Sequence, residues 1–457
     1  MFLFTFGCAG SARIYAKHDR RVEAGHFTDA AALLERHEGR LFGKRNALLY
    51  HLEMGMLAHL AGDYAESNTL FERAKRIAEL LFTESASAQV VSFLSNDRVR
   101  AYQGEHFERA LIHVFSALNY ELLGDHEGAL VEARQVDLLL TKIETDLGQK
   151  NVYKEDAFAR YLSAMLFDSG GNWNDANVAY WKALEAYEKY ERDYGVGAPA
   201  SLLPAALAVA ERRGSRALRR MEKRWGAAQP RRPSPEHGEV IVLHYNGWVP
   251  HKVESFFELS FGQGWAYVGA MHPTEEEEAE IDTALAVVRS LAADEILRVA
   301  LPTYVPTPYS IAHVELSAPD ATNITPAQLV EDIGAIAAKD LEDRIGRVRA
   351  KAIARAAVKY GISKGACEVS DDLDQLLSLL VCGAAKVALI ATERADTRFW
   401  RNVPDQIWMI SAFLPAGEHA LSLAFRDAAG QVVAQQTLEG VRIEPGQRTF
   451  VVIRTTQ

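Results

Sequence analysis

Apolar and polar positions in the first half of the chain follow a helical period that the same kind of turn interrupts several times. In each copy an amphipathic stretch ends at a glycine, usually followed by Asp or Asn and a ring-bearing residue, and a second helical stretch rich in small residues begins. Glycine permits the left-handed backbone that ends a helix, and small residues let the next helix pack closely. The pattern therefore predicts antiparallel helical hairpins. The copies are LEMGMLAHLAGDYAESNTLFERAKRIAE, FSALNYELLGDHEGALVEARQVD, YLSAMLFDSGGNWNDANVAYWKALEAY and, more weakly, VEAGHFTDAAALLERH.

These hairpins resemble tetratricopeptide (TPR) repeats, which place small residues at helical spacing around a Gly-Asp-Tyr turn. The turn glycines at 25, 62, 124 and 171 are separated by 37, 62 and 47 residues, whereas the family repeats every ~34 residues. The resemblance therefore implies a degenerate TPR-like solenoid, with long helices and inserted segments, over residues 20–225. The alternative is a helical bundle in which such hairpins arise by chance. Matching positions are Gly55, Gly62, Tyr64, Phe71 and Ala74, then Ala117, Gly124, Ala129 and Ala133, then Ala164, Gly171, Trp173, Ala176, Tyr180 and Ala183.

Residues 226–237 interrupt the helical period with prolines, glycines and basic residues, which predicts an extended linker. Beyond it, EVIVLHYNGW, FELSF and QRTFVVIRT have strand composition, and ALSLAFRDAAGQVVAQQTL predicts a hairpin turning near Gly430. The prolines of LPTYVPTPYS confine that segment to a sheet edge or a loop. PTEEEEAEIDTALAVVRSL and a stretch from about Pro326 to Tyr360 predict helices. Residues 238–457 are therefore expected to form an α+β domain with a mainly antiparallel sheet.

Composition narrows the class of protein. The chain has 457 residues, 48% of them hydrophobic and 24% charged, which is enough for two or three folded domains. A net charge of -11 argues against binding to nucleic acid, because neutralising phosphates needs a basic surface. The three cysteines exclude a disulfide-dense scaffold and a four-cysteine zinc site. Cys367 and Cys382 remain either as one disulfide, which the periplasm permits, or as two buried thiols.

The N-terminal stretch MFLFTFGCAG ends an apolar run with Gly7 and Cys8. This arrangement resembles the end of a bacterial lipoprotein signal, in which the cysteine is lipidated. It departs from that pattern at Thr5 and Phe6, and no basic region precedes the apolar run. Residues 1–19 are therefore expected to be a signal remnant and tether, with Cys8 as the lipidated residue. The alternative is an accidental match.

Charged residues between Tyr102 and Gln135 mark the most distinctive part of the predicted hairpins. Facing helices of a hairpin can bring such charges together on the concave side of a solenoid, where repeat proteins bind partners. One alternative is a set of i,i+4 pairs on a solvated surface, such as Glu105 with Arg109. A second alternative is a set of buried structural pairs. The residues expected to bind a partner are Glu105, Glu108, Arg109, Glu132 and Arg134.

A second charged feature lies in LEDRIGRVRAKAIARAAVKY, where four basic residues recur at i+4 steps along one helix. Such a stripe suits contact with an anionic surface such as lipid headgroups or a polymer. The alternative is the solvated side of an amphipathic helix. The stripe consists of Arg347, Lys351, Arg355 and Lys359.

Several of these stretches together resemble a family of uncharacterised bacterial lipoproteins with TPR-like repeats, over residues 45–415. The resemblance implies a lipid anchor at Cys8 and a periplasmic location. Ala9 in place of Asp favours the outer membrane. The stretches that carry the resemblance are YQGEHFERALIHVFSALNYELLGDHEGALVEAR, VYKEDAFARYLSAMLF, GEVIVLHYNGW, KDLEDRIGRVRAKAIARAAVKY and ADTRFWRNVP.

Two classes of function follow. The first is a lipid-anchored periplasmic scaffold whose TPR-like solenoid mediates protein–protein interaction with other envelope proteins. The alternative is an envelope enzyme that hydrolyses polymer or lipid, with a site in the α+β domain. The sequence lacks a nucleophile elbow, a metalloprotease helix, a phosphate-binding loop and a dinucleotide-binding motif. Nothing in it indicates a catalytic residue, a metal or a cofactor, and this favours the scaffold.

Overall fold

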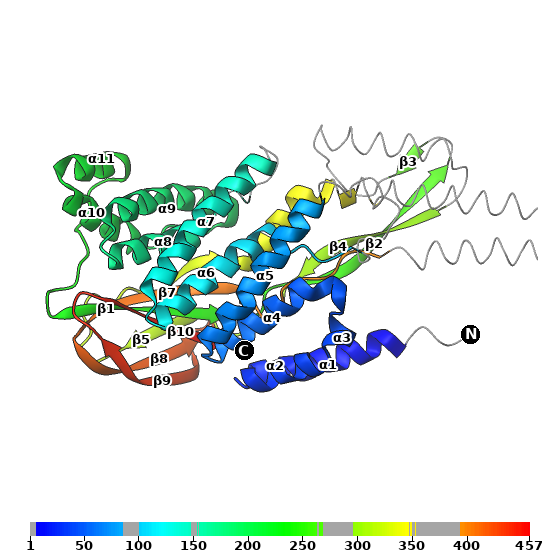
Figure 1. Ribbon diagram of the computed structural model, residues 1–457, viewed down its shortest axis with the longest axis horizontal. Helices are drawn as coiled ribbons and strands as arrows, with labels where there is room; N and C mark the ends of the chain where they lie inside the picture. The colour runs from blue at the N-terminus through cyan, green and yellow to red at the C-terminus, as the bar shows by residue number, and fades with distance from the viewer. Residues whose placement is uncertain are drawn as a thin grey trace, which may run out of the picture.

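The computed structural model describes residues 6–85, 100–147, 153, 155–262, 265–267, 296–346, 348, 349, 352 and 394–457. Helices occupy the chain up to Trp225, and strands dominate from His237 onward. Figure 1 shows the helices as a layer over one face of a sheet, with a smaller sheet against the opposite face. A helical region followed by an α+β part is therefore present, as the sequence predicts.

The helical region is built from antiparallel hairpins closed by tight glycine turns. Gly62, Gly124 and Gly171 have φ angles of 82°, 76° and 69°, which residues with a side chain rarely adopt. Within the first of these hairpins a Cβ at Gly55 would lie 2.5 Å from a ring carbon of Phe71, so only glycine allows this approach. The helices are α1 (Phe6–Glu23), α2 (Phe27–Arg36), α3 (Glu38–Leu41), η1 (Lys44–Asn46), α4 (Ala47–Leu60), α5 (Tyr64–Ser85), α6 (His106–Leu122), α7 (His126–Leu147), α8 (Ala157–Ser169), α9 (Trp173–Tyr194), α10 (Leu202–Arg213) and α11 (Ser215–Trp225).

The described strands form three sheets, in the orders β10-β1-β7-β6, β3-β2-β4 and β5-β8-β9. The pair β1–β10 is parallel, and the other described strand pairs are antiparallel. The prediction of a mainly antiparallel architecture is confirmed. The strands are β1 (His237–Asn246), β2 (His251–Gly262), β3 (Trp265–Tyr267), β4 (Ile296–Val305), β5 (His313–Ser317), β6 (Gln328–Asp332), β7 (Gln406–Pro415), β8 (Gly417–Arg426), β9 (Val432–Ile443) and β10 (Arg448–Thr455).

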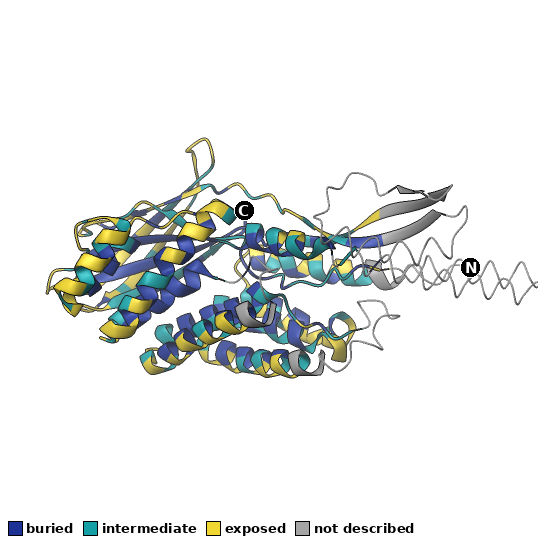
Figure 2. Ribbon diagram, turned by 90° about the horizontal axis from the view of Figure 1, so that it is seen from above, coloured by how far each residue is buried: buried dark blue, intermediate teal, exposed yellow. Residues whose placement is uncertain are grey.

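Strand β1 is buried on both faces and divides the core in two. Because side chains alternate along a strand, Leu243 and Tyr245 pack with the helices, whereas Val240 and Val242 pack against the β5-β8-β9 sheet. Figure 2 shows the buried residues concentrated where the helices and the sheet meet. One hydrophobic cluster thus contains residues of both regions and extends across the predicted linker at 226–237.

Most of the predicted strands are present at their expected positions. Strand β4 contains Pro302 and lies at a sheet edge, as its prolines require. The predicted helix from Pro326 to Tyr360 is wrong at its start, because Gln328–Asp332 pairs with β7 as strand β6 and the helix begins at 333. The acidic helix predicted around 273–291 lies outside the described residues.

Candidate functional site

Glu105 and Glu108 lie at the start of α6, where both are directed into the protein. Glu105 forms ion pairs with Lys252 of β2 and, at 2.7 Å, with Arg344 of the helix over residues 333–346. Burial by itself raises the pKa of a carboxyl group, but these two cations outweigh it and hold the pKa of Glu105 well below its ordinary value. Glu108 is only 1% exposed. Burial and the neighbouring charge of Glu105 raise the pKa of Glu108 to about 7.

Residues 396–403, here called the docked segment, lie against the helices without helix or strand structure, and the segment turns at 401–403. The backbone N–H of Trp400 donates to Glu108 Oε1 at 2.8 Å. The Trp400 ring is buried beside Phe71 and Phe115, with centroids 5.8 Å from each. The helical array thus binds a non-helical segment of its own chain, with carboxylates accepting backbone hydrogen bonds and aromatic rings enclosing a tryptophan.

Glu53 of α4 holds the next two residues of the docked segment. It accepts hydrogen bonds from the Arg401 backbone N–H at 2.7 Å, the Asn402 backbone N–H at 3.1 Å and Asn402 Nδ2 at 2.7 Å. Burial raises the pKa of Glu53 to about 7, and the hydrogen bonds from Arg401 and Asn402 offset part of that shift. Glu53 and Glu108 together fix three consecutive residues of the segment.

Glu132 belongs to a different cluster, within the helical layer. Its carboxylate pairs with Lys75 of α5 and His113 of α6, each at 2.7 Å, so it joins α5, α6 and α7. Burial acts to raise the pKa of Glu132, but the bond from His113 and the charge of Lys75 outweigh it and lower the pKa. The structure therefore does not bring Glu132 together with Glu105 and Glu108. Glu105, Glu108 and Glu132 each match the alternative of buried structural pairs.

Arg134 is the member of the predicted set that remains on the outside. It is exposed on α7, and its guanidinium carbon lies 5.6 Å from the centroid of the Phe167 ring. Arg109 is half-buried on α6. The expected binding surface is thus divided: its acidic members hold the chain together internally, and only Arg134 is available to a partner.

A new candidate surface surrounds Arg134. Val131 and Leu138 are 51% and 61% exposed, and their spacing of three and four residues from Arg134 puts all three on one face of α7. We call these three residues the α7 face. Arginine and exposed aliphatic side chains together are typical of protein-binding surfaces. The sequence could have indicated the α7 face, because α7 has more apolar positions than a single core-facing stripe needs.

The remaining predicted sites are the lipidation site at Cys8, the basic stripe and the cysteine pair. Cys8 lies in α1, and its lipidation stays a prediction. In the described ranges, no helix is long and apolar enough to cross a bilayer. No group of three or more His, Cys, Asp or Glu side chains among these residues is arranged to hold a metal. The basic stripe and the cysteine pair lie outside the described part of the chain: Arg347, Lys351, Arg355, Lys359, Cys367 and Cys382.

Comparison with known proteins found no family model and no curated protein that matches this chain. The resemblance to bacterial lipoproteins therefore stays a prediction. By its own geometry the chain is a helical-hairpin protein packed on a mixed sheet, with the docked segment held by its helices and the α7 face exposed.

Proposed function

We propose that the protein is a lipid-anchored scaffold of the bacterial envelope, whose TPR-like helical array mediates protein–protein interaction. Repeated hairpins with glycine turns support the repeat assignment. The docked segment supports a binding role, because the same helices already hold a non-helical segment by its backbone and by one large aromatic side chain. The periplasmic location and the anchor to the outer membrane rest on the sequence around Cys8.

The exposed apolar pair on α7 carries this proposal. Among the described residues, the sheet and the docked segment cover the inner side of the helical layer, which leaves the outer side of these helices to a partner. On that side Val131 and Leu138 expose more than half of their surface next to Arg134. An interface centred on these residues would bury aliphatic surface around one cation, which suits a partner with an acidic rim.

The test of partner binding uses the double variant Val131→Asp/Leu138→Asp. Partners are purified from detergent-solubilised envelopes of the native host, and affinity is then measured with the purified partner. Each hot-spot residue contributes ~2 kcal/mol or more, so we expect a loss of at least ~30-fold in affinity with an unchanged melting temperature. Val432→Asp, at a residue of β9 that is 44% exposed, is the matched control. Capture of the same partner by the folded double variant refutes the α7 face.

The test of the anchor is separate from the test of the partner. The gene is expressed with its native upstream region, and membranes are separated from soluble protein. We expect Cys8→Ala to move the protein from the membrane fraction to the soluble fraction, and metabolic labelling with a fatty acid to disappear. Unchanged membrane association of Cys8→Ala contradicts the anchor and leaves the α7 face to its own test.

A further inference from the structure

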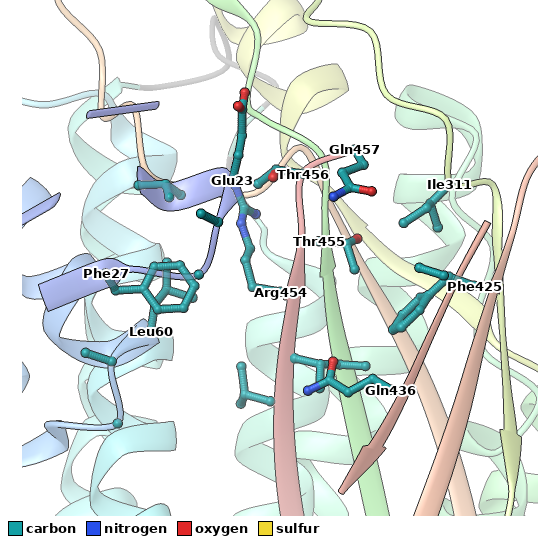
Figure 3. A pocket seen from close by; sticks show the side chains of 18 of the residues that line it. Glu23, Phe27, Leu60, Ile311, Phe425, Gln436, Arg454, Thr455, Thr456 and Gln457 are labelled. Atoms are coloured by element: carbon teal, nitrogen blue, oxygen red, sulfur yellow. The ribbon is translucent and has the colours of Figure 1, made fainter. Parts of the chain in front are cut away.

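A pocket of about 500 Å³ lies where the helical turns meet the free edge of β10 (Figure 3). The turns after α1 and α4 form one wall and include Phe27 and Leu60. The ends of β9 and β10 form the other wall and include Gln436 and Arg454. The size is that of pockets for small molecules, and the walls contain both apolar and polar side chains.

Two arginines on β10 face the helices and differ sharply in their partners. Arg448, Phe450, Val452 and Arg454 follow one another at every second position of β10, so their side chains lie on the same face of the strand. Phe450 and Val452 pack with the helical layer, and this face therefore points toward the helices. Arg448 donates to Asp168 at 2.7 Å, to Glu239 at 2.9 Å and to the carbonyl of Met165 at 2.9 Å. The three guanidinium nitrogens of Arg454 are also buried, but none has a hydrogen-bond partner among the described residues.

Arg454 stacks on an aromatic ring but has no ion-pair or hydrogen-bond partner among the described residues. Its guanidinium carbon lies 5.5 Å from the centroid of the Trp248 ring. Asp405 is near enough to act on it electrostatically, but accepts a 2.7 Å bond from the Tyr309 hydroxyl and forms no ion pair with it. Tyr245, opposite Arg454 on β1, pairs with His59. Burial lowers the pKa of Arg454 to about 9, against the opposing effect of Tyr245 and Asp405. Burial also lowers the pKa of His59 to about 4, so this histidine is neutral near pH 7.

Figure 3 shows Arg454 extending from β10 into the space between the sheet and the helical turns. A buried guanidinium without hydrogen-bond partners is costly, since it loses hydration and gains no hydrogen bond in return, and contact with the Trp248 ring offsets only part of that cost. Its five N–H donors form a planar fork that matches the oxygens of a carboxylate or a phosphate. An oxyanion here would supply both the missing charge and the missing acceptors.

We propose that this pocket is a binding site for a small oxyanion-bearing ligand, and that Arg454 anchors its anionic group. Phe27 and Leu60 provide apolar walls for the body of the ligand, and the Gln436 amide provides a polar contact. The class is a small organic carboxylate or phosphate ester, which share the planar pair of acceptor oxygens. This inference is independent of the scaffold proposal, because the pocket and the α7 face have no residue in common.

The test measures thermal melting of the full chain in inorganic phosphate, in acetate and in chloride at matched ionic strength. We expect phosphate or acetate to raise the melting temperature in a saturable way, whereas chloride has no such effect. The anion that acts distinguishes a phosphate ligand from a carboxylate ligand. Arg454→Met should abolish the rise, and Arg454→Lys should weaken binding at least ~10-fold, because an ammonium lacks the fork. No anion-dependent rise in the wild type, or an undiminished rise in Arg454→Met, overturns the proposal.

A second measurement separates ligand binding from a structural role. In buffer without these anions, Arg454→Met should melt at or above the wild-type temperature. It removes a buried charge that has no hydrogen-bond partner among the described residues, and methionine can keep an apolar contact with Trp248. Arg448→Met, on the same face of the same strand, should melt well below it, because Asp168 loses its cation and Glu239 keeps only the 3.5 Å ion pair with Arg231 among the described residues. If both variants melt well below the wild type, Arg454 is a structural residue and the proposal fails.

Discussion

Removal of the Glu53 carboxylate should destabilise the fold by leaving buried donors of the docked segment without an acceptor. Glu53 is 3% exposed and accepts three hydrogen bonds, from two backbone N–H groups and one amide of the segment. In Glu53→Ala these donors stay buried, because Trp400 on one side and β7 on the other keep the segment in place. The variant therefore converts satisfied donors into unsatisfied ones.

The size of the effect follows from the number of donors. Each buried donor left without an acceptor costs ~1–3 kcal/mol. With three donors, and partial relaxation of the segment toward water, we expect Glu53→Ala to lower the free energy of unfolding by about 3 kcal/mol or more. That is a large part of the ~5–15 kcal/mol that stabilises a typical protein.

Urea unfolding at pH 6 measures this loss, and hydrogen exchange reports the segment directly. We expect the backbone amides of Arg401 and Asn402 to exchange faster in Glu53→Ala, and tryptophan fluorescence to change as the surroundings of Trp400 loosen. Glu35→Ala is the control, because Glu35 is exposed on α2 and its loss should change stability by less than ~0.5 kcal/mol. A loss below ~1 kcal/mol in Glu53→Ala, with both amides still protected, refutes this reasoning.

Two further predictions concern pH and proteolysis. The pKa of Glu53 is raised from 4.5 to about 7 in the folded protein, so its stabilising contribution is full below pH 4.5 and is lost as pH rises through 7. Relative to Glu53→Gln, which does not titrate, the wild type should lose about 3 kcal/mol of stability between pH 4.5 and 8 in urea titrations. A constant difference across that range contradicts the shift. A protease should cut within residues 226–236, which have no regular secondary structure over most of their length. The two pieces should nevertheless co-elute in gel filtration, because one hydrophobic cluster includes Phe115 and Tyr245 from opposite sides of the cut. Separation into two folded fragments without denaturant contradicts a shared core.

Local features of this protein could be predicted from its sequence because their causes are local. Glycine at 62, 124 and 171 allows the positive φ of a tight turn, and the small residues nearby allow close helix contact. The apolar run of β1 predicted a strand, and its unbroken character reflects burial on both faces. Pro302 restricted its segment to a sheet edge, where β4 lies.

The positions of the charged side chains were decided by tertiary contacts. Glu108 accepts a hydrogen bond from the backbone of Trp400, which lies 292 residues further along the chain. A contact between residues so far apart cannot be predicted from the local sequence pattern. Strand β6 replaced the start of a predicted helix because β7 offered it a pairing partner. The sequence therefore predicted the hairpins and strands, whose periodicity is local, but not the internal role of Glu105, Glu108 and Glu132.

The two arginines of β10 show the same limit most directly. Arg448 and Arg454 share a strand, a side-chain direction and burial of their guanidinium groups, and the sequence gives no reason to treat them differently. Helix α8 places Asp168 beside Arg448, whereas the turns after α1 and α4 leave a pocket beside Arg454. The sequence by itself determined that two cations lie on this strand. Only the packing of distant helices decided that one is paired within the fold and the other has no hydrogen-bond partner among the described residues, because ion pairs depend on distances that the fold sets.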